Sequence, residues 1–267
     1  MPVLPLLALS FSVAGGAAGP AAAADAIPAY AADVLYQMPD GSESTGRVVQ
    51  SGPDMRMERN DGGRAMVQIL RQGEGMMYML DPARQVWFKV RTEPDPQAGS
   101  GAYRAPCGET MMSADLCRRL GTEVASGITA ELWEIGPPGG ADVSRILWDG
   151  TRQRALREQG PDGTVLTRTF QAMVEIEGRS AEHWAITLTR PGQPPESGAW
   201  YFDPELRVDL REEIPGGPTR SLRNIVVGPV DPAAFAPPAG WREVEPPVAR
   251  RAPGAGAPGA PVPPPAN

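Results

Sequence analysis

The sequence predicts a mainly β protein with one large, curved antiparallel sheet, a half-barrel formed by a meander of hairpins, and few short helices. Apolar and polar residues alternate along most of residues 29–228, and almost no stretch keeps a helical period. One hairpin-like pattern occurs three times. The 31 glycines and 31 prolines among 267 residues indicate the many turns that such a meander needs.

The three repeats share an apolar run that ends in Asp, a Pro or Gly directly after it, and a second alternating run. They lie at 78–84, 146–152 and 201–207. Asp at the first turn position can bond the backbone two residues on, and Pro at the second presets φ, so each repeat predicts a hairpin. The last two repeats match further, because 131–135 resembles 182–186 and 164–174 resembles 219–227. Each of these two units therefore predicts four strands in up-and-down order.

Helical signals are few. Ser113–Leu120, with Ser113 as cap and Gly121 as stop, and Asp231–Phe235 predict short helical turns. Because so few helices are available to cover the sheet, it either curls on itself or leaves a concave apolar surface for a ligand.

Residues 1–24 predict a secretory signal sequence, because the uncharged apolar run Val3–Val13 precedes the small residues 21–24. The run is too short to span a bilayer. No basic residue precedes it, so we expect the true start to lie upstream; a non-secreted alanine-rich leader is the alternative. No Cys stands at the cleavage region, so we expect no lipid anchor. The mature chain is expected to be a soluble periplasmic protein without an integral membrane segment.

Residues 246–267 predict a disordered tail, which leaves 25–245 as the folded domain. Pro, Ala and Gly dominate the tail, and such a composition buries too little apolar surface to offset the entropy of ordering. The tail is typical of a spacer; the alternative is a ligand for a proline-reading partner.

Cys107 and Cys117 are the only two cysteines. In an oxidising compartment such a pair predicts a disulfide, which in the chain-entropy model stabilises the fold by about 2.8 kcal/mol. A reactive dithiol is the alternative, but its usual C-x-x-C spacing is absent.

Composition excludes several function classes. With 25 basic against 32 acidic residues the net charge is −7, which argues against nucleic-acid binding. His183 is the only histidine, so a His-rich metal site is excluded. No G-x-S-x-G and no close carboxylate pair on one face occurs, so we expect no enzyme and no cofactor.

Methionine and tryptophan suggest a surface for a ligand. Met is flexible and polarisable and is common where a surface adapts to varied apolar ligands. The candidate ligand-lining residues are Met55, Met57, Met66, Met77, Met79, Trp87, Trp133, Trp148 and Trp200. The alternative is an ordinary core filled with these side chains.

Several segments carry a resemblance to a known family: 46–49 leading to 56–59, then 78–82, 222–225, and the closing stretch 231–241 with its Asp-x-x-x-Phe and Pro-x-Gly-aromatic pattern. In these the chain resembles the periplasmic lipoprotein carriers (LolA/LolB-like) and their uncharacterised secreted relatives. The resemblance implies a curved half-barrel that binds acyl chains on its concave side, with the cargo-release arginine at Arg56 or Arg59. The N-terminal and lid helices of the carriers are not evident, and the Cys107–Cys117 segment is an addition.

Two main functions remain open. The first is a non-enzymatic protein that binds a hydrophobic ligand, a lipid or a lipoprotein acyl chain, on the concave face. The second is an envelope module that binds a protein partner and has a filled core. A Cu(I) site is a further alternative, since thioethers are soft ligands; its candidates are Met76, Met77, Met79, Met111 and Met112.

Overall fold

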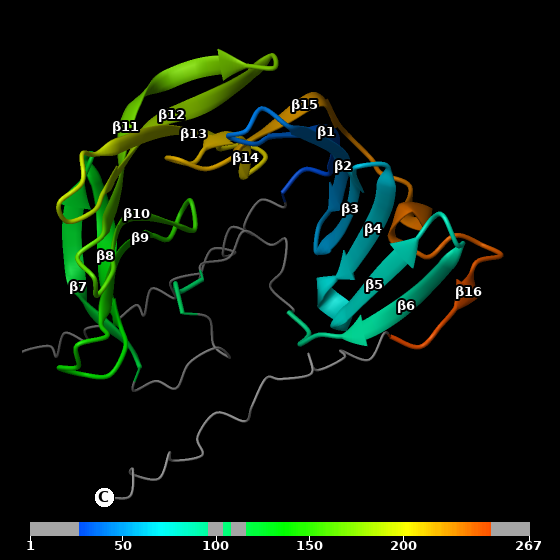
Figure 1. Ribbon diagram of the computed structural model, residues 1–267, viewed down its shortest axis with the longest axis horizontal. Coiled ribbons are helices and arrows are strands. Elements are labelled where there is room, and N and C mark those ends of the chain that lie inside the picture. Colours follow the sequence, from blue (N-terminus) through cyan, green and yellow to red (C-terminus); the bar gives the residue numbers. More distant parts are fainter. Residues whose placement is uncertain (1–26, 96–103, 108–115, 247–267) are drawn as a thin grey trace, which may run out of the picture.

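The computed structural model describes residues 27–95, 104–107 and 116–246 (Figure 1). The strands of the first half are β1 (Tyr30–Gln37), β2 (Glu43–Ser51), β3 (Asp54–Asp61), β4 (Arg64–Arg71), β5 (Met76–Asp81) and β6 (Val86–Arg91). The later strands are β7 (Cys117–Ala125), β8 (Ile128–Ile135), β9 (Ser144–Asp149), β10 (Arg154–Gln159), β11 (Val165–Ile176), β12 (Arg179–Thr189), β13 (Glu196–Asp203), β14 (Val208–Glu213), β15 (Thr219–Val227) and β16 (Arg242–Glu243). Two 3-10 turns, η1 (Gln72–Glu74) and η2 (Pro232–Phe235), complete the list.

These strands form one open, strongly curved sheet, as the sequence predicts. Their order is β16-β6-β5-β4-β3-β2-β1-β15-β14-β13-β12-β11-β10-β9-β8-β7, so two meanders meet where β15 returns to pair with β1. Every neighbouring pair is antiparallel except β16 and β6. The sheet arches over a concave side, and its edge strands β7 and β16 lie at the two ends of the arch (Figure 1). The predicted fold class is confirmed.

The three repeats form the hairpins β5–β6, β9–β10 and β13–β14. In each, the aspartate carboxylate accepts a hydrogen bond from a backbone N–H of the turn: Asp81 from Arg84, Asp149 from Thr151, and Asp203 from Glu205. The residue four places after each aspartate has a φ of 51° or 52° and leads into the returning strand; these residues are Gln85, Gln153 and Arg207. The predicted turn chemistry is therefore confirmed.

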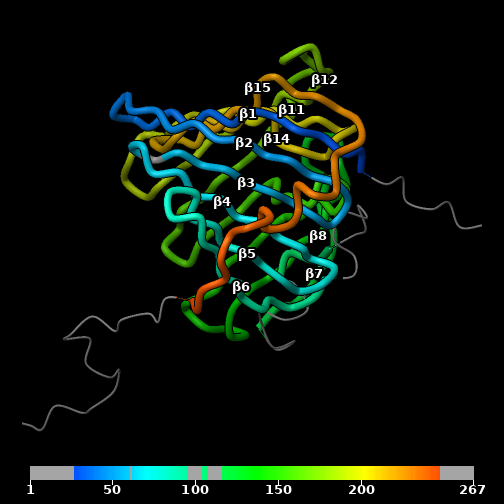
Figure 2. The backbone as a smooth tube through the Cα atoms, turned by 90° about the vertical axis from the view of Figure 1, so that its right-hand side faces the viewer, coloured from blue at the N-terminus to red at the C-terminus, as the bar shows by residue number. Residues whose placement is uncertain are grey.

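The outer face of the first half is covered by the segment that follows β15. Asp231 caps η2 by accepting a hydrogen bond from the Ala233 N–H, so the predicted turn at Asp231–Phe235 is confirmed. Phe235 is 4% exposed and packs with the outward side chains of β2, β4 and β5, namely Val49, Val67, Ile69 and Leu80. This segment crosses the outer surface of β3–β5 (Figure 2).

The β9–β10 hairpin fills part of the concave side of the second half. Leu147 and Leu156 from this hairpin form one buried cluster with Trp184 and Trp200, and both tryptophans are 0% exposed. Figure 1 shows β9 and β10 inside the arch that β11–β13 form. This cluster is a packed core within the second half of the concave side.

One expectation is wrong. The helical turn predicted for Ser113–Leu120 is not present in its described part, because Cys117–Leu120 opens β7. Pairing of β7 with β8 overrides the weak local helix signal. Cys107 and Cys117 form the predicted disulfide, with 6.3 Å between their Cα atoms. The predicted signal sequence (1–24) and residues 247–267 of the predicted tail lie outside the described residues, so both stay predictions.

Candidate functional site

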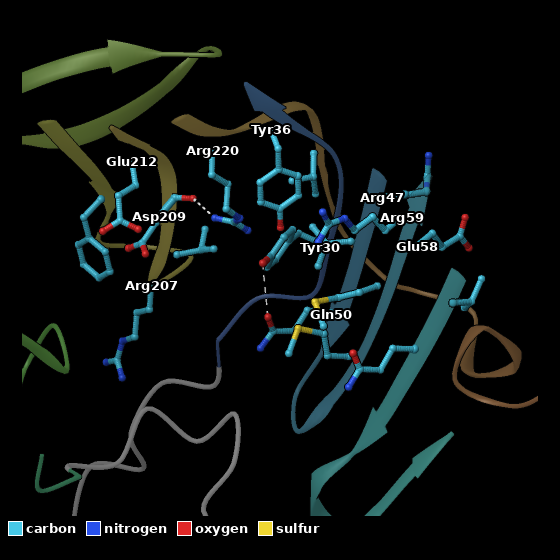
Figure 3. A pocket seen from close by; sticks show the side chains of 18 of the residues that line it. Tyr30, Tyr36, Arg47, Gln50, Glu58, Arg59, Arg207, Asp209, Glu212 and Arg220 are labelled. Carbon is cyan, nitrogen blue, oxygen red and sulfur yellow. Dashed lines mark hydrogen bonds between the residues drawn. The ribbon is translucent and has the colours of Figure 1, made fainter. Parts of the chain in front are cut away.

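The open part of the concave side holds a cavity of about 710 Å³. Strands β1–β5 line it on one side; the tip of the β9–β10 hairpin and strands β13–β15 line it on the other (Figure 3). A volume of this size lies in the range of small-molecule sites. The cavity therefore spans the junction between the two meanders.

The side of the cavity on β3–β5 is rich in methionine. Alternate residues of a strand share a face, which places Met55 and Met57 together on β3, and cross-strand pairing adds Met66 from β4 and Met79 from β5. Met57 is 38% exposed and Met66 is 42% exposed. These flexible thioether side chains give the cavity an adaptable apolar wall.

The opposite side is charged, and Arg154 organises it. Its guanidinium donates to the Asp209 carboxylate and, at 2.8 Å, to Oε1 of Glu212. The same group lies over the ring of Trp200 with its central carbon 4.6 Å from the centroid. Trp200 in turn donates from Nε1 to Oδ1 of Asp209 at 2.6 Å. Arg154 is thereby fixed by two carboxylates and one aromatic face.

Arg152 connects the hairpin tip to β12. Its Nε and Nη2 donate to both carboxylate oxygens of Glu182 at 2.6 and 2.7 Å, and Nη1 donates to Oδ2 of Asp149 at 2.5 Å. The two carboxylates hold the pKa of Arg152 above its ordinary value, chiefly because Glu182 accepts hydrogen bonds from the guanidinium. Asp149 is 3% exposed, so this bridge is largely shielded from water.

Between the apolar and charged sides lies a polar group from β1, β2 and β15. The Tyr30 hydroxyl donates to Oε1 of Gln50 at 3.4 Å, and burial raises the pKa of Tyr30 to about 12. Arg220 donates from Nη1 to the backbone oxygen of Asp209 at 3.2 Å. The guanidinium of Arg59 lies 5.4 Å from the ring centroid of Tyr36. Figure 3 shows these side chains converging on the cavity.

The structure brings together four of the nine predicted ligand-lining residues, namely Met55, Met57, Met66 and Met79. Met77 lies next to them and accepts a hydrogen bond at its sulfur from Gln68 Nε2, at 2.7 Å.

The four predicted tryptophans do not line this cavity. Trp87 packs on the outer face beside Tyr78, with 5.7 Å between their ring centroids. Trp133 donates to Glu131, and Trp148 donates to the backbone oxygen of Arg104 at 2.8 Å. Trp200 is buried behind Arg154. None of these placements tests ligand contact, so the predicted roles stay predictions.

The two candidate release arginines lie in different surroundings. Arg56 donates to Glu58 at 2.7 Å and to the backbone oxygen of Ala234 at 3.1 Å, so it ties η2 to the sheet. Arg59 lines the concave cavity against Tyr36. Of the pair, only Arg59 is among the residues that line this cavity, and the release role stays a prediction.

The charged side of the cavity was missed by sequence reasoning. Its main members are Arg152, Arg154, Asp209, Glu212 and Arg220. For Arg220 a signal existed: it alternates with Leu222 on a strand whose apolar residues point inward, which indicates that Arg220 faces the concave side. For Arg152 and Arg154 there was none, because nothing local in the sequence indicates that the β9–β10 hairpin folds onto that side.

The described part of the chain holds no cluster of three or more His, Cys, Asp or Glu side chains suited to a metal ion. Met76 and Met77 are successive residues of β5 and face opposite sides of the sheet, whereas Met111 and Met112 lie outside the described residues. His183 stacks on Tyr201 with 4.7 Å between ring centroids and lies outside the cavity lining. Within 27–95, 104–107 and 116–246, no helix is long and apolar enough to span a membrane.

Fold and site together define an open β half-barrel whose concave side holds a cavity with one methionine-rich and one charged wall. Neither a family model nor a curated protein matches the sequence.

Solved structures do align with it. An outer membrane lipoprotein-sorting protein domain from Vibrio parahaemolyticus aligns at 11% identity and a TM-score of 0.36, over 80% of this chain and 92% of that one. MucB in its complex with MucA(peri) aligns at 12% identity and a TM-score of 0.19, over 78% and 97%. The Pseudomonas aeruginosa MucA/MucB complex aligns at 12% identity and a TM-score of 0.21, over 79% and 92%. The first of these is a lipoprotein-sorting protein domain, the class that the sequence resembles.

Proposed function

We propose that the mature chain is an exported, non-enzymatic protein that binds a hydrophobic ligand, a lipid or a lipoprotein acyl chain, in the concave cavity. The observation that carries the proposal is the wall of Met55, Met57, Met66 and Met79, which leaves two large apolar side chains more than one-third exposed inside a cavity. Apolar side chains gathered in a concave surface are typical of ligand sites.

The energy available from such a wall is sufficient for binding. Each buried methylene contributes about 0.8 kcal/mol, so a chain of about a dozen methylenes gains roughly 10 kcal/mol before the cost of association. Specificity would come from the polar groups at the other end of the cavity. Release would need a competing acceptor.

The first test is native mass spectrometry of the mature protein purified from the periplasm of its source, with lipid extraction of the same sample. We expect a co-purifying acyl-chain species. A bare protein mass, together with no uptake of a fluorescent fatty-acid probe, contradicts the proposal.

A matched set of variants locates the site. Met57→Glu should lower the affinity for the neutral probe N-phenyl-1-naphthylamine at least tenfold, because a carboxylate then lies in the apolar wall. Met38→Glu is the control, since Met38 is a methionine of similar exposure, 43%, outside the cavity lining. Equal losses from both variants, or none from Met57→Glu, would place binding elsewhere.

The packed core of the second half favours a second candidate, an envelope module that binds a protein partner. Trp184 and Trp200 are fully buried with Leu147 and Leu156 of the β9–β10 hairpin, so side chains fill that part of the concave side. This candidate predicts a bare protein mass and no probe uptake, which separates it from the first.

A further inference from the structure

We propose that the ligand is a single-chain amphiphile with an anionic headgroup, which Arg220 binds beside Tyr30 and Tyr36 while the alkyl chain lies on the methionine wall. This inference rests on the proposed function and adds to it the chemical class and the orientation of the ligand.

The first step is the charge state of the cavity. Arg154 forms ion pairs with the carboxylates of both Asp209 and Glu212. Arg152 likewise forms ion pairs with Asp149 and Glu182. Each of these two groups keeps one negative charge, because one arginine holds two carboxylates. The cavity lining as a whole is nevertheless positive, since it contains six arginines (Arg47, Arg59, Arg152, Arg154, Arg207 and Arg220) against the three acidic residues Glu58, Asp209 and Glu212. A net positive lining favours an anionic ligand over a cationic one.

Arg220 differs from these two arginines. Among the described residues it donates to a backbone oxygen, that of Asp209, and forms no ion pair. A backbone carbonyl is a neutral acceptor, so the charge of Arg220 stays available to an anion. A guanidinium binds carboxylate and phosphate groups with several parallel hydrogen bonds.

The neighbours of Arg220 suit an anion as well. On β15 it stands between Tyr36 of β1 and Glu212 of β14, and Tyr30 lies on the same face of β1. The Glu212 carboxylate is already held by Arg154 at 2.8 Å. Arg220 is near enough to Tyr30 to act on its titration, yet burial still raises the pKa of that hydroxyl to about 12. The Tyr30 hydroxyl therefore keeps its proton in neutral solution, and an anion would compete with Gln50 for the one hydrogen that this hydroxyl donates. Figure 3 shows Arg220, Tyr36 and Tyr30 side by side at the cavity.

The spacing between this group and the methionine wall fits an alkyl chain. From β15 the order runs through β1 and β2 to β3, where Met55 and Met57 lie. Neighbouring strands are about 4.8 Å apart, so three steps cover about 14 Å, the reach of an extended chain of about a dozen carbons. One amphiphile can therefore contact Arg220 and the methionines at the same time.

The test compares dodecanoate, monododecanoylglycerol and dodecyltrimethylammonium as competitors of N-phenyl-1-naphthylamine on the mature protein at pH 8, below their micelle concentrations. The three share an alkyl length and differ in headgroup charge. We expect dodecanoate to bind at least tenfold more tightly than either of the others. Arg220→Gln should reduce dodecanoate to the affinity of the neutral ester and leave the ester unchanged, whereas Arg220→Lys should keep part of the preference.

Arg211→Gln is the matched control, because Arg211 is on the neighbouring strand β14, on the opposite face, paired with Glu213 at 2.7 Å. Thermal unfolding of each variant confirms that it is folded. Equal affinities of the three competitors, or an equal loss of all three in Arg220→Gln, would overturn this inference and leave the proposed function standing. Absence of any binding by the probe and the competitors would overturn both.

Discussion

Arg152→Ala should destabilise the protein strongly, because it leaves two shielded carboxylates without a partner. Arg152 holds both oxygens of Glu182 at 2.6 and 2.7 Å and Oδ2 of Asp149 at 2.5 Å. Removing one member of a buried ion pair costs about 3–5 kcal/mol. The side chain of Arg152 is 18% exposed and that of Glu182 is 10% exposed, so solvent screens the bridge little and we expect a loss of about 3 kcal/mol.

Urea unfolding of the oxidised mature protein, followed by tryptophan fluorescence, measures this loss as a lower midpoint at an unchanged slope. Arg152→Lys should recover only part of it, because an ammonium cannot match the planar contact with Glu182. Arg211→Ala is the control: its pair with Glu213 is exposed at 47% and 35%, and such pairs contribute at most about 1 kcal/mol. If Arg152→Ala cost no more than Arg211→Ala, the bridge would not hold the hairpin and the reasoning would fail.

Two further predictions concern the core. The pKa of Tyr30 is raised from 10.0 to about 12, so the unfolded chain ionises there first and stability falls as pH rises above 10, by about 1.4 kcal/mol per unit until about pH 12. Tyr30→Phe should remove that slope in urea unfolding at pH 9.5–11; an identical slope in both proteins would contradict the assignment. Phe235→Ala should cost about 3–5 kcal/mol, since Phe235 is 4% exposed under the outer face. Phe170→Ala, at a position 37% exposed, should cost clearly less in the same measurement.

The fold was predictable because its signals are local. Each Asp-Pro or Asp-Gly turn has its own hydrogen bond, which the carboxylate of Asp81, Asp149 or Asp203 accepts from a backbone N–H two or three residues on. Alternation on either side of the turn then specifies a hairpin. The return of β15 to β1 has no such local signal. It joins residues far apart in the chain, as in the hydrogen bond from Asn224 to Asp33 across 191 positions.

The methionine wall of the candidate site was predictable because it too depends on a local signal, whereas the charged wall was not. Met55 and Met57 share a face because strand side chains alternate, and this can be read from the sequence. The positions of Trp200 and Arg154 depend on where the β9–β10 hairpin packs. That packing is set by contacts such as Arg152 to Glu182, 30 positions apart. No periodicity in the chain encodes a contact of that kind.

The pairing of β15 with β1 also sets the order in which the molecule can assemble. Within the sheet, the first six strands pair with the second meander only where β1 meets β15, which begins at residue 219; β16 adds to β6 at the opposite edge. Closing contacts of such long sequence separation is slow, so each meander can form its hairpins well before the two are joined. The cavity draws its walls from both meanders and is therefore among the last features to form during folding. Until then the methionine wall lies on an open sheet in water, and an early-binding apolar molecule could act as a template for the final closure.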